Sequence, residues 1–240
     1  MAFAPASLAT KLLAQNQGSD LPIQLVQPGG TLWSGYGTLL NQGQALGNLR
    51  WQAKPSSLLS GRVGADLWLD LLGQSSGSSG GKLSGNLTSN TSSTSLDLQG
   101  KLAGSWISQW LAQYEVELGG EINTDNFRAS LDPNNYLRTL AAQGDLTWSG
   151  GLVRYRLGNR LANQRLAPMN AVVQGDMANP EGITAEVFGQ ESYPLLKLAL
   201  LPDGHAKVSI TQRLTEIVGA PWPGSEPDHE LVLVVEQAVF

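Results

Sequence analysis

The chain has 240 residues, of which 41% are hydrophobic and only 15% are charged, with 28 Gly and 12 Pro. This balance favours many short strands joined by tight turns over long charged helices, in one or two domains. The formal net charge of −5 argues against the basic surface of a nucleic-acid binder, and the lack of cysteine excludes disulfides, thiolate metal sites and cysteine nucleophiles.

Residues 1–20 are predicted to form an N-terminal segment separate from the rest of the chain. Leu8, Leu12 and Leu13 lie on one side of a short helix that would begin after Pro5. Two interpretations stay open for this segment: an ordinary N-terminal helix, or a juxtamembrane helix that follows a removed segment. No apolar run in the sequence approaches the roughly 20 residues that cross a bilayer.

From residue 21 onward the recurring signal is alternation of apolar and polar residues. It is carried by residues 48–53, 62–70, 81–88, 114–118, 153–157 and 183–187. Such alternation is typical of antiparallel strands with one packed and one wet face, and the short Gly-, Asn- and Pro-rich connections are typical of hairpins. In the second of these segments Trp68 is an exception, because it falls among the polar residues. We predict an all-β fold, an extended, strongly curved antiparallel meander sheet of one or two layers, with one or two short helices.

Two Ser-, Gly- and Thr-rich stretches, residues 73–85 and 88–95, have the composition of a flexible linker. Strands of the same one-faced type occur on both sides of them. We therefore predict a long, mobile hairpin here and not a domain boundary.

Two segments have a short helical pattern. Residues 104–113 place Trp106 and Trp110 four apart, with Ser105 as the expected N-cap, and residues 213–218 precede Gly219, an expected C-terminal stop.

The last segment, residues 229–240, is apolar on both sides of the expected strand. This pattern predicts a strand that is central in its sheet or that pairs with a partner.

No catalytic, cofactor-binding or metal-binding residues are predicted. A G-x-S-x-G motif centred on Ser79 lies inside a Ser/Gly run, without the preceding strand, following helix and histidine that a hydrolase needs. The two histidines are His205 and His229. Residues 228–230 alternate between the two faces of a strand, whereas a zinc site needs three or four converging ligands.

The seven tryptophans are expected to be structural anchors, because a buried indole removes a large apolar area from water. Trp-Ser-Gly occurs twice, at residues 33–35 and 148–150, where glycine lets a ring lie across the neighbouring backbone. The predicted anchors are Trp33, Gly35, Trp51, Trp148 and Gly150.

The two copies have two interpretations. They mark a weak internal repeat, which divides a single β-domain of residues 21–240 into halves 21–140 and 141–240, or they are two independent hairpins.

The order of several phrases resembles protein N of the bacterial type II secretion system, also called general secretion pathway protein N. These phrases are "PASLATKLL", "GGTLWSGYGTLL", "LGNLRWQAKPSSLLSGRVGADLWL", "GSWISQWLAQYEVELGGEI" and "AAQGDLTWSGGLVRY". They span Pro5 to Tyr155, and their order and spacing carry the resemblance more than any one of them.

The resemblance implies a non-enzymatic subunit that aids protein export across the outer membrane. It implies a β-rich domain on the periplasmic side of the inner membrane, attached by a helix removed before Ala2, and no cofactor. The implied partners are other type II secretion subunits, namely the inner-membrane platform and the secretin.

The family is also similar to the AsmA-like group, whose extended sheets form apolar grooves associated with lipid. This similarity implies a second function, in which the sheet binds a lipid or another apolar ligand. The expected groove-lining residues are Leu49, Val63, Leu67 and Leu83.

Overall fold

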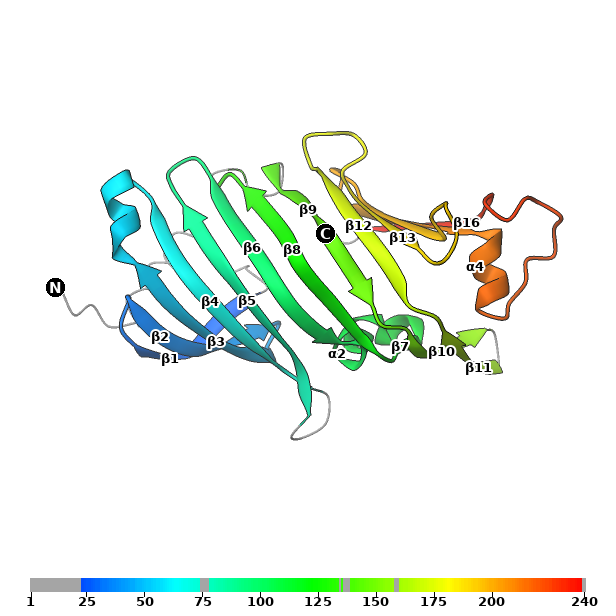
Figure 1. Cartoon of the computed structure of the whole chain (residues 1–240), viewed down its shortest axis with the longest axis horizontal. Helices are drawn as coiled ribbons and strands as arrows, with labels where there is room; N and C mark the ends of the chain where they lie inside the picture. Colours follow the sequence, from blue (N-terminus) through cyan, green and yellow to red (C-terminus); the bar gives the residue numbers. More distant parts are fainter. Residues whose placement is uncertain (1–22, 74–77, 134, 136–138, 158–159, 239–240) are drawn as a thin grey trace.

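One large antiparallel sheet dominates the computed structural model of this chain, which describes residues 23–73, 78–133, 135, 139–157 and 160–238 (Figure 1). The first part contains β1 (Ile23–Gly30), β2 (Ser34–Asn41), β3 (Gln44–Lys54), the 3₁₀ helix η1 (Pro55–Ser60), β4 (Val63–Leu72), β5 (Ser79–Ser89), β6 (Thr94–Ala103), α2 (Gly104–Leu111), the 3₁₀ helix η2 (Ala112–Tyr114), β7 (Glu117–Leu118) and β8 (Glu121–Leu131). The second part contains β9 (Ala141–Trp148), β10 (Gly151–Leu157), β11 (Arg160–Leu166), β12 (Met169–Asp176), β13 (Ile183–Phe188), β14 (Leu196–Leu200), β15 (His205–Thr211), α4 (Gln212–Ile217) and β16 (Leu231–Ala238).

The sheet follows the order of the chain. Its 13 strands are arranged β1-β2-β3-β4-β5-β6-β8-β9-β12-β13-β14-β15-β16, and a second, small sheet has the order β11-β10-β7. Neighbouring strands pair antiparallel throughout. Since β1 and β16 lie at opposite ends of the order, the large sheet is open. The predicted all-β antiparallel meander is confirmed.

The register separates the side chains into an apolar and a polar face. Leu49 lies opposite Leu69, which lies opposite Leu83 on the next strand, and paired residues share a face. The same alternation reaches the far end, where Val173, Ala185, Leu198, Val208 and Val235 lie opposite one another across β12 to β16. We call the side of the sheet with these residues the apolar face and the opposite side the polar face.

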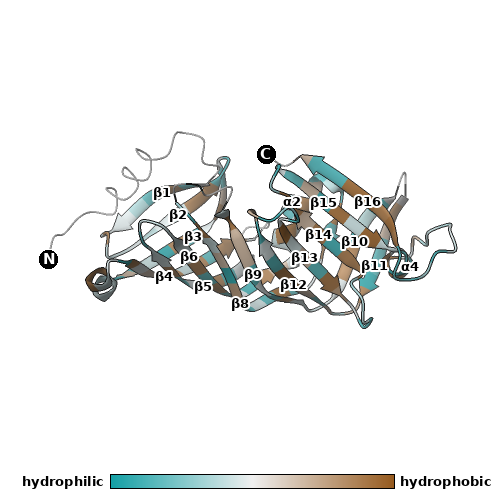
Figure 2. Ribbon diagram, turned by 90° about the horizontal axis from the view of Figure 1, so that it is seen from above, coloured by the Kyte–Doolittle hydropathy of each residue, from teal (hydrophilic) through white to brown (hydrophobic). Residues whose placement is uncertain are grey.

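The sheet is strongly curved, so that its two ends lie on the same side of its centre (Figure 2). Ile217 and Val218, which follow β15, pack onto the cluster around Trp148 on the apolar face. The hydroxyl of Tyr114, in η2, donates a hydrogen bond of 2.7 Å to Oε1 of Gln237 in β16. The curvature therefore turns the apolar face inward.

The small sheet packs against the apolar face and forms a core with Trp148. The Trp148 side chain is 9% exposed and packs with the buried Val153 and Leu166. Its Nε1–H donates a hydrogen bond of 2.8 Å to the carbonyl of Gly119. Gly150 has a φ of +75°, and a Cβ on it would lie 2.7 Å from the Leu166 carbonyl oxygen. Only glycine fits here without strain.

The two predicted helices are confirmed as α2 and α4, with one difference. Ser105 lies inside α2, whose N-cap is Ala103 without a side-chain hydrogen bond, so the predicted Ser105 cap is wrong. In α4 the N-cap is Thr211, whose hydroxyl accepts from the Leu214 N–H, and Gly219 follows the helix with a φ of +78° as predicted.

Two strand predictions need correction. Residues 114–116 were predicted as part of a strand, but Glu115 has a φ of +54°, which ends η2 in a left-handed turn and leaves only the two-residue β7. Of the two interpretations of the C-terminal strand, the central position is wrong, because β16 is the last strand of the sheet; pairing with a partner stays a prediction. The apolar side chains on both sides of β16 are therefore exposed, and are not buried between two neighbouring strands.

The Ser- and Gly-rich stretch contains an interior strand of the sheet. β5 is 11 residues long, pairs with both β4 and β6, and is joined to β6 by a turn at residues 90–93. The predicted hairpin is thus present between residues 79 and 103, and its mobility stays a prediction.

The predicted boundary between halves, after residue 140, falls between β8 and β9, which pair with each other in the large sheet. The two-halves interpretation stays a prediction. The N-terminal segment 1–20 lies outside the described residues. Within the described ranges, no helix has the length and apolar character to traverse a bilayer.

We predict that Trp148→Ala lowers the free energy of unfolding by about 3–5 kcal/mol, the usual cost of truncating a buried aromatic residue. Trp148→Phe, which loses the hydrogen bond to Gly119 but keeps most of the ring, should cost less. Urea unfolding measures both. Trp110→Ala, which removes an exposed ring from α2, is the matched control. A Trp148→Ala protein as stable as the Trp110→Ala protein would contradict the role of this cluster.

Candidate functional site

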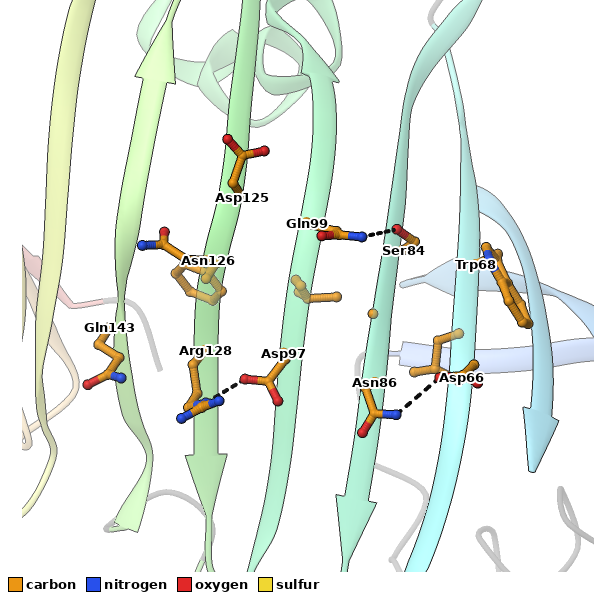
Figure 3. Close-up of a pocket in the computed structure, with 14 residues that line it drawn as sticks. Asp66, Trp68, Ser84, Asn86, Asp97, Gln99, Asp125, Asn126, Arg128 and Gln143 are labelled. Carbon is orange, nitrogen blue, oxygen red and sulfur yellow. Dashed lines mark hydrogen bonds and ion pairs between the residues drawn. The ribbon is translucent and has the colours of Figure 1, made fainter. Parts of the chain in front are cut away.

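The polar face of the large sheet contains a trough. It has a volume of about 640 Å³ and crosses β4, β5, β6, β8 and β9 (Figure 3). Its floor is the main chain around Leu67, Gly85, Leu98 and Phe127. Two rows of polar-face side chains flank this floor, one with Trp68, Ser84, Gln99, Asp125 and Asn126, and one with Asp66, Asn86, Asp97, Arg128 and Gln143. We call this feature the polar trough.

The antiparallel register builds both rows. Asp66 lies opposite Asn86, Asn86 opposite Asp97, and Asp97 opposite Arg128, so that four successive strands present one row. Trp68 lies opposite Ser84, and Ser84 opposite Gln99, in the same way. Since the two rows are two residues apart along each strand, the main chain between them is left uncovered on this face.

A register shift between β6 and β8 lies within the trough. Leu98 lies opposite Phe127, but Gly100 lies opposite Thr124, so β8 contains one extra residue there. The side chain of Asn126 is held across the bulge: its amide donates to Asp145 Oδ2 at 2.8 Å, and its Oδ1 accepts from the Asp145 N–H at 3.0 Å. The bulge therefore fixes one amide of the trough in a defined orientation.

Most charges of the polar trough are paired. Asp66 Oδ1 lies 2.7 Å from Lys54 Nζ and accepts a hydrogen bond of 3.1 Å from the Asn86 amide. The Lys54 contact, followed by the Asn86 hydrogen bond, lowers the pKa of Asp66 below its ordinary value. Asp97 pairs with Arg128, and this hydrogen bond raises the pKa of the Arg128 guanidinium.

The trough has little net charge. Its lining contains Asp66, Asp97 and Asp125 against Arg128. Since Lys54 beside the trough pairs with Asp66, a single negative charge is left in excess. This is not the basic surface that a nucleic acid needs.

Most side chains of this site are groups that bind a ligand by hydrogen bonding. The hydroxyl of Ser84 accepts a hydrogen bond of 3.4 Å from the Gln99 amide. An amide is not a base, so this contact does not activate the serine. Over the described part of the chain, no group of three or more His, Cys, Asp or Glu side chains is placed to hold a metal ion. Amides, carboxylates, a guanidinium and one indole remain, which recognise a ligand by hydrogen bonding and stacking.

The G-x-S-x-G motif acquires no catalytic partners among the contacts of its serine. Ser79 begins β5, and its hydroxyl accepts a hydrogen bond of 3.3 Å from the Gly81 N–H. His205 contacts Asp203, and the His229 ring packs edge-on against Tyr193. Neither contact brings a histidine to Ser79.

The structure brings three predicted anchors together beside β1. The Trp51 ring lies over Gly35, where a Cβ would collide with it, and its Nε1–H donates a hydrogen bond of 3.2 Å to the Leu32 carbonyl. The Trp33 carbonyl accepts a hydrogen bond of 2.7 Å from the Ala53 N–H. Trp148 and Gly150 lie apart from these, in the core at the small sheet. The contribution of the five residues to stability stays a prediction.

The four predicted groove residues share the apolar face. Leu49, Leu67 and Leu83 occupy central strands and are half-buried, whereas Val63 is exposed at the start of β4. They lie on the opposite side of the sheet from the polar trough.

The polar trough itself was missed by the sequence reasoning. Its residues come from five strands and are separated by up to 77 positions, from 66 to 143, so no local motif marks them. The one available signal was Trp68, an indole on the side of its strand that otherwise carries charges.

Comparison with known proteins identifies a family. The model of the family described as type II secretion system (T2SS), protein N matches residues 22–220 of the chain. No curated protein and no solved structure matches it.

We predict that Lys54→Met raises the pKa of Asp66 toward its ordinary value, because the largest contribution to its lowering is removed. A carboxyl with a lowered pKa stabilises the fold above its unfolded pKa and loses this effect as the pH falls through its folded pKa, so the variant should lose less stability on acidification. The change at neutral pH should stay below about 1 kcal/mol, since both partners are more than a third exposed.

Carboxyl chemical shifts followed by NMR during an acid titration measure this pKa. Lys101→Met, which removes an exposed ammonium elsewhere on the polar face, is the control and should leave the Asp66 titration in place. An Asp66 pKa that does not change in Lys54→Met would contradict the assignment.

Proposed function

Because the chain belongs to the type II secretion system protein N family, we propose that this component of the secretion machine is a structural subunit that binds other subunits through an edge of its sheet. The proposed site of action is the periplasmic side of the inner membrane. The proposed partners are the inner-membrane platform and the secretin.

This proposal rests on the exposure of β16 at the end of the large sheet. Leu233, Val234 and Val235 are 41%, 50% and 48% exposed, although successive residues point to opposite faces of the strand. β16 pairs with β15 on one side only and ends the large sheet. A long apolar edge strand with free main-chain groups promotes aggregation unless a partner covers it.

Strand addition is the mode of binding that fits such an edge. A partner strand would pair with the main chain of β16, while its side chains would cover the apolar residues on both faces. The Tyr114–Gln237 hydrogen bond holds one end of β16 against η2 and so limits the motion of the strand before binding. An edge held in place loses less conformational entropy on binding than a free segment.

A second function, the binding of a lipid or another apolar ligand, is favoured by a different observation. The apolar face extends over all 13 strands, yet few of its side chains are fully buried, and Leu49, Leu67 and Leu83 are only half-buried. Ligand binding would remove such a face from water. The inward curvature of the sheet is compatible with this function.

The assembly proposal predicts covalent capture at β16. A photoreactive amino acid in place of Leu233, in the full-length protein in cells that secrete through this system, should give an adduct with another secretion subunit. In the same protein, Val234→Lys should lower the adduct yield at least fivefold, because a charge on an edge strand opposes pairing. Immunoblotting and mass spectrometry of the adduct measure both.

Leu161 provides the matched control, since it is an exposed apolar residue on β11, an edge strand of the small sheet. A photoreactive amino acid there should give no adduct with the same subunit. Absence of any β16 adduct with a secretion subunit, in cells that secrete normally, would contradict the proposal.

The ligand proposal predicts a difference between two adjacent residues. Leu83→Glu places a charge on the apolar face and should remove lipid that copurifies with the protein, whereas Ser84→Glu places the same charge on the polar face and should retain it. Native mass spectrometry of gently purified protein measures the bound mass. A wild-type protein without bound lipid would remove this second function.

A further inference from the structure

We propose that the polar trough binds a linear β-1,4-linked glycan chain, laid across the strands. This function is independent of the proposed strand pairing at β16, because the two surfaces occupy different parts of the sheet. The trough lies between β4 and β9, whereas β16 forms the far end.

The spacing of the strands fits such a chain. Neighbouring strands lie about 4.8 Å apart, which is close to the length of one pyranose unit, so a chain that crosses the sheet meets roughly one strand per sugar. The trough runs in this direction, across five strands, with its two rows of side chains parallel to its length (Figure 3). The ligand would therefore be extended and contain several sugars.

Two exposed aromatic residues lie on the line of the first row. Tyr36 lies opposite Arg50, and Arg50 opposite Trp68, so all three share the polar face. Tyr36 is 60% and Trp68 38% exposed. The two residues are two strands apart, so their Cα atoms are separated by about 10 Å across the sheet. This is close to the length of two sugars, and in a β-1,4-linked chain every second sugar presents the same face. Each ring can therefore stack on an equivalent sugar of the chain.

The local structure holds the Tyr36 ring against the sheet. Gly29 of β1 lies beneath this ring, and a Cβ at Gly29 would collide with it. With no side chain at this position, the ring lies on the neighbouring backbone and keeps one face toward solvent. A flat aromatic ring with one free face is the group that stacks on a sugar.

The remaining groups of the trough are planar and polar, as required for sugar hydroxyls, which donate and accept hydrogen bonds. Asn86, Gln99 and Gln143 provide amides, and Asp66 and Arg128 provide a carboxylate and a guanidinium. Asp66 and Arg128 are held by Lys54 and Asp97, so their orientation is set before a ligand arrives. Preorganised polar groups on a rigid sheet lose little entropy on binding.

The charge and the floor of the trough disfavour other polymers. With Lys54 beside Asp66 and Arg128 beside Asp97, the trough has no excess of positive charge, which nucleic acid and other polyanions require. An extended peptide binds a sheet by pairing with the main chain of an edge strand. The floor here consists of interior strands, whose main-chain groups already pair with both neighbours.

Isothermal titration calorimetry of the purified chain with N-acetylchitohexaose and with cellohexaose tests the proposal. At least one hexamer should bind, and the corresponding disaccharide should bind at least tenfold more weakly, because it spans too few strands. Trp68→Ala should weaken hexamer binding at least tenfold and Tyr36→Ala several-fold. Trp110→Ala, which removes an exposed indole from α2, should leave the affinity unchanged.

Gln99→Ala, which removes an exposed amide, should also weaken binding several-fold and keeps the proposal testable if Trp68→Ala fails to fold. Thermal melting verifies the fold of each variant. The proposal is overturned if neither hexamer binds, if a folded Trp68→Ala binds like the wild type, or if α-linked maltohexaose, whose chain coils, binds equally well. Binding of an extended peptide in the trough that is lost in Trp68→Ala, with no glycan binding, would likewise overturn it.

Discussion

The structure depends on the correct register between all neighbouring strands of the 13-stranded sheet. In an antiparallel sheet a slip of one residue turns every side chain of a strand to the opposite face, so an apolar face that extends from β1 to β16 requires the correct register at 12 successive pairings. The assignment of side chains to the two faces continues past the bulge in β8. Thr124 and Phe127 are three positions apart and should point to opposite faces, yet both pair with apolar-face positions of β6, Gly100 and Leu98, because the extra residue is absorbed between them.

An open sheet that is mostly a single layer has an energetic consequence. Few hydrophobic side chains of the described residues are fully buried, and Trp148, Val153 and Leu166 form a cluster only where the small sheet covers the apolar face. Elsewhere the sheet is held by its hydrogen-bond ladder, by cross-strand side-chain pairs and by the curvature that turns its apolar face inward. Such a molecule keeps large surfaces available for binding, which a sandwich or a closed barrel would bury.

The fold was largely predictable from the sequence because alternation is local, whereas the positions of strands in the sheet are not. Residues 48–53 and 62–70 already show which side chains share a face. The pattern of β16 was correctly read as two-sided, but a central strand and an exposed edge strand produce the same pattern, and only the topology separates them. Ser105 and Glu115 were misjudged because a shift of two residues in a helix start, or a single left-handed residue, is not marked by the local sequence pattern.

The polar trough could not be predicted for the same reason, because the positions of its strands in the sheet are not a local property of the sequence. Trp68 signalled an exception, but its partners Asn86, Gln99 and Arg128 come from β5, β6 and β8, and only the register aligns them. The same register separates three surfaces. The apolar face is inward, the polar trough is outward, and β16 is at the end of the sheet, so the trough lies on the opposite side of the sheet from the apolar face and away from β16. The glycan proposed for the trough would therefore compete neither with the strand proposed for β16 nor with the apolar ligand proposed for the inner face, because the trough shares no side chains with either surface.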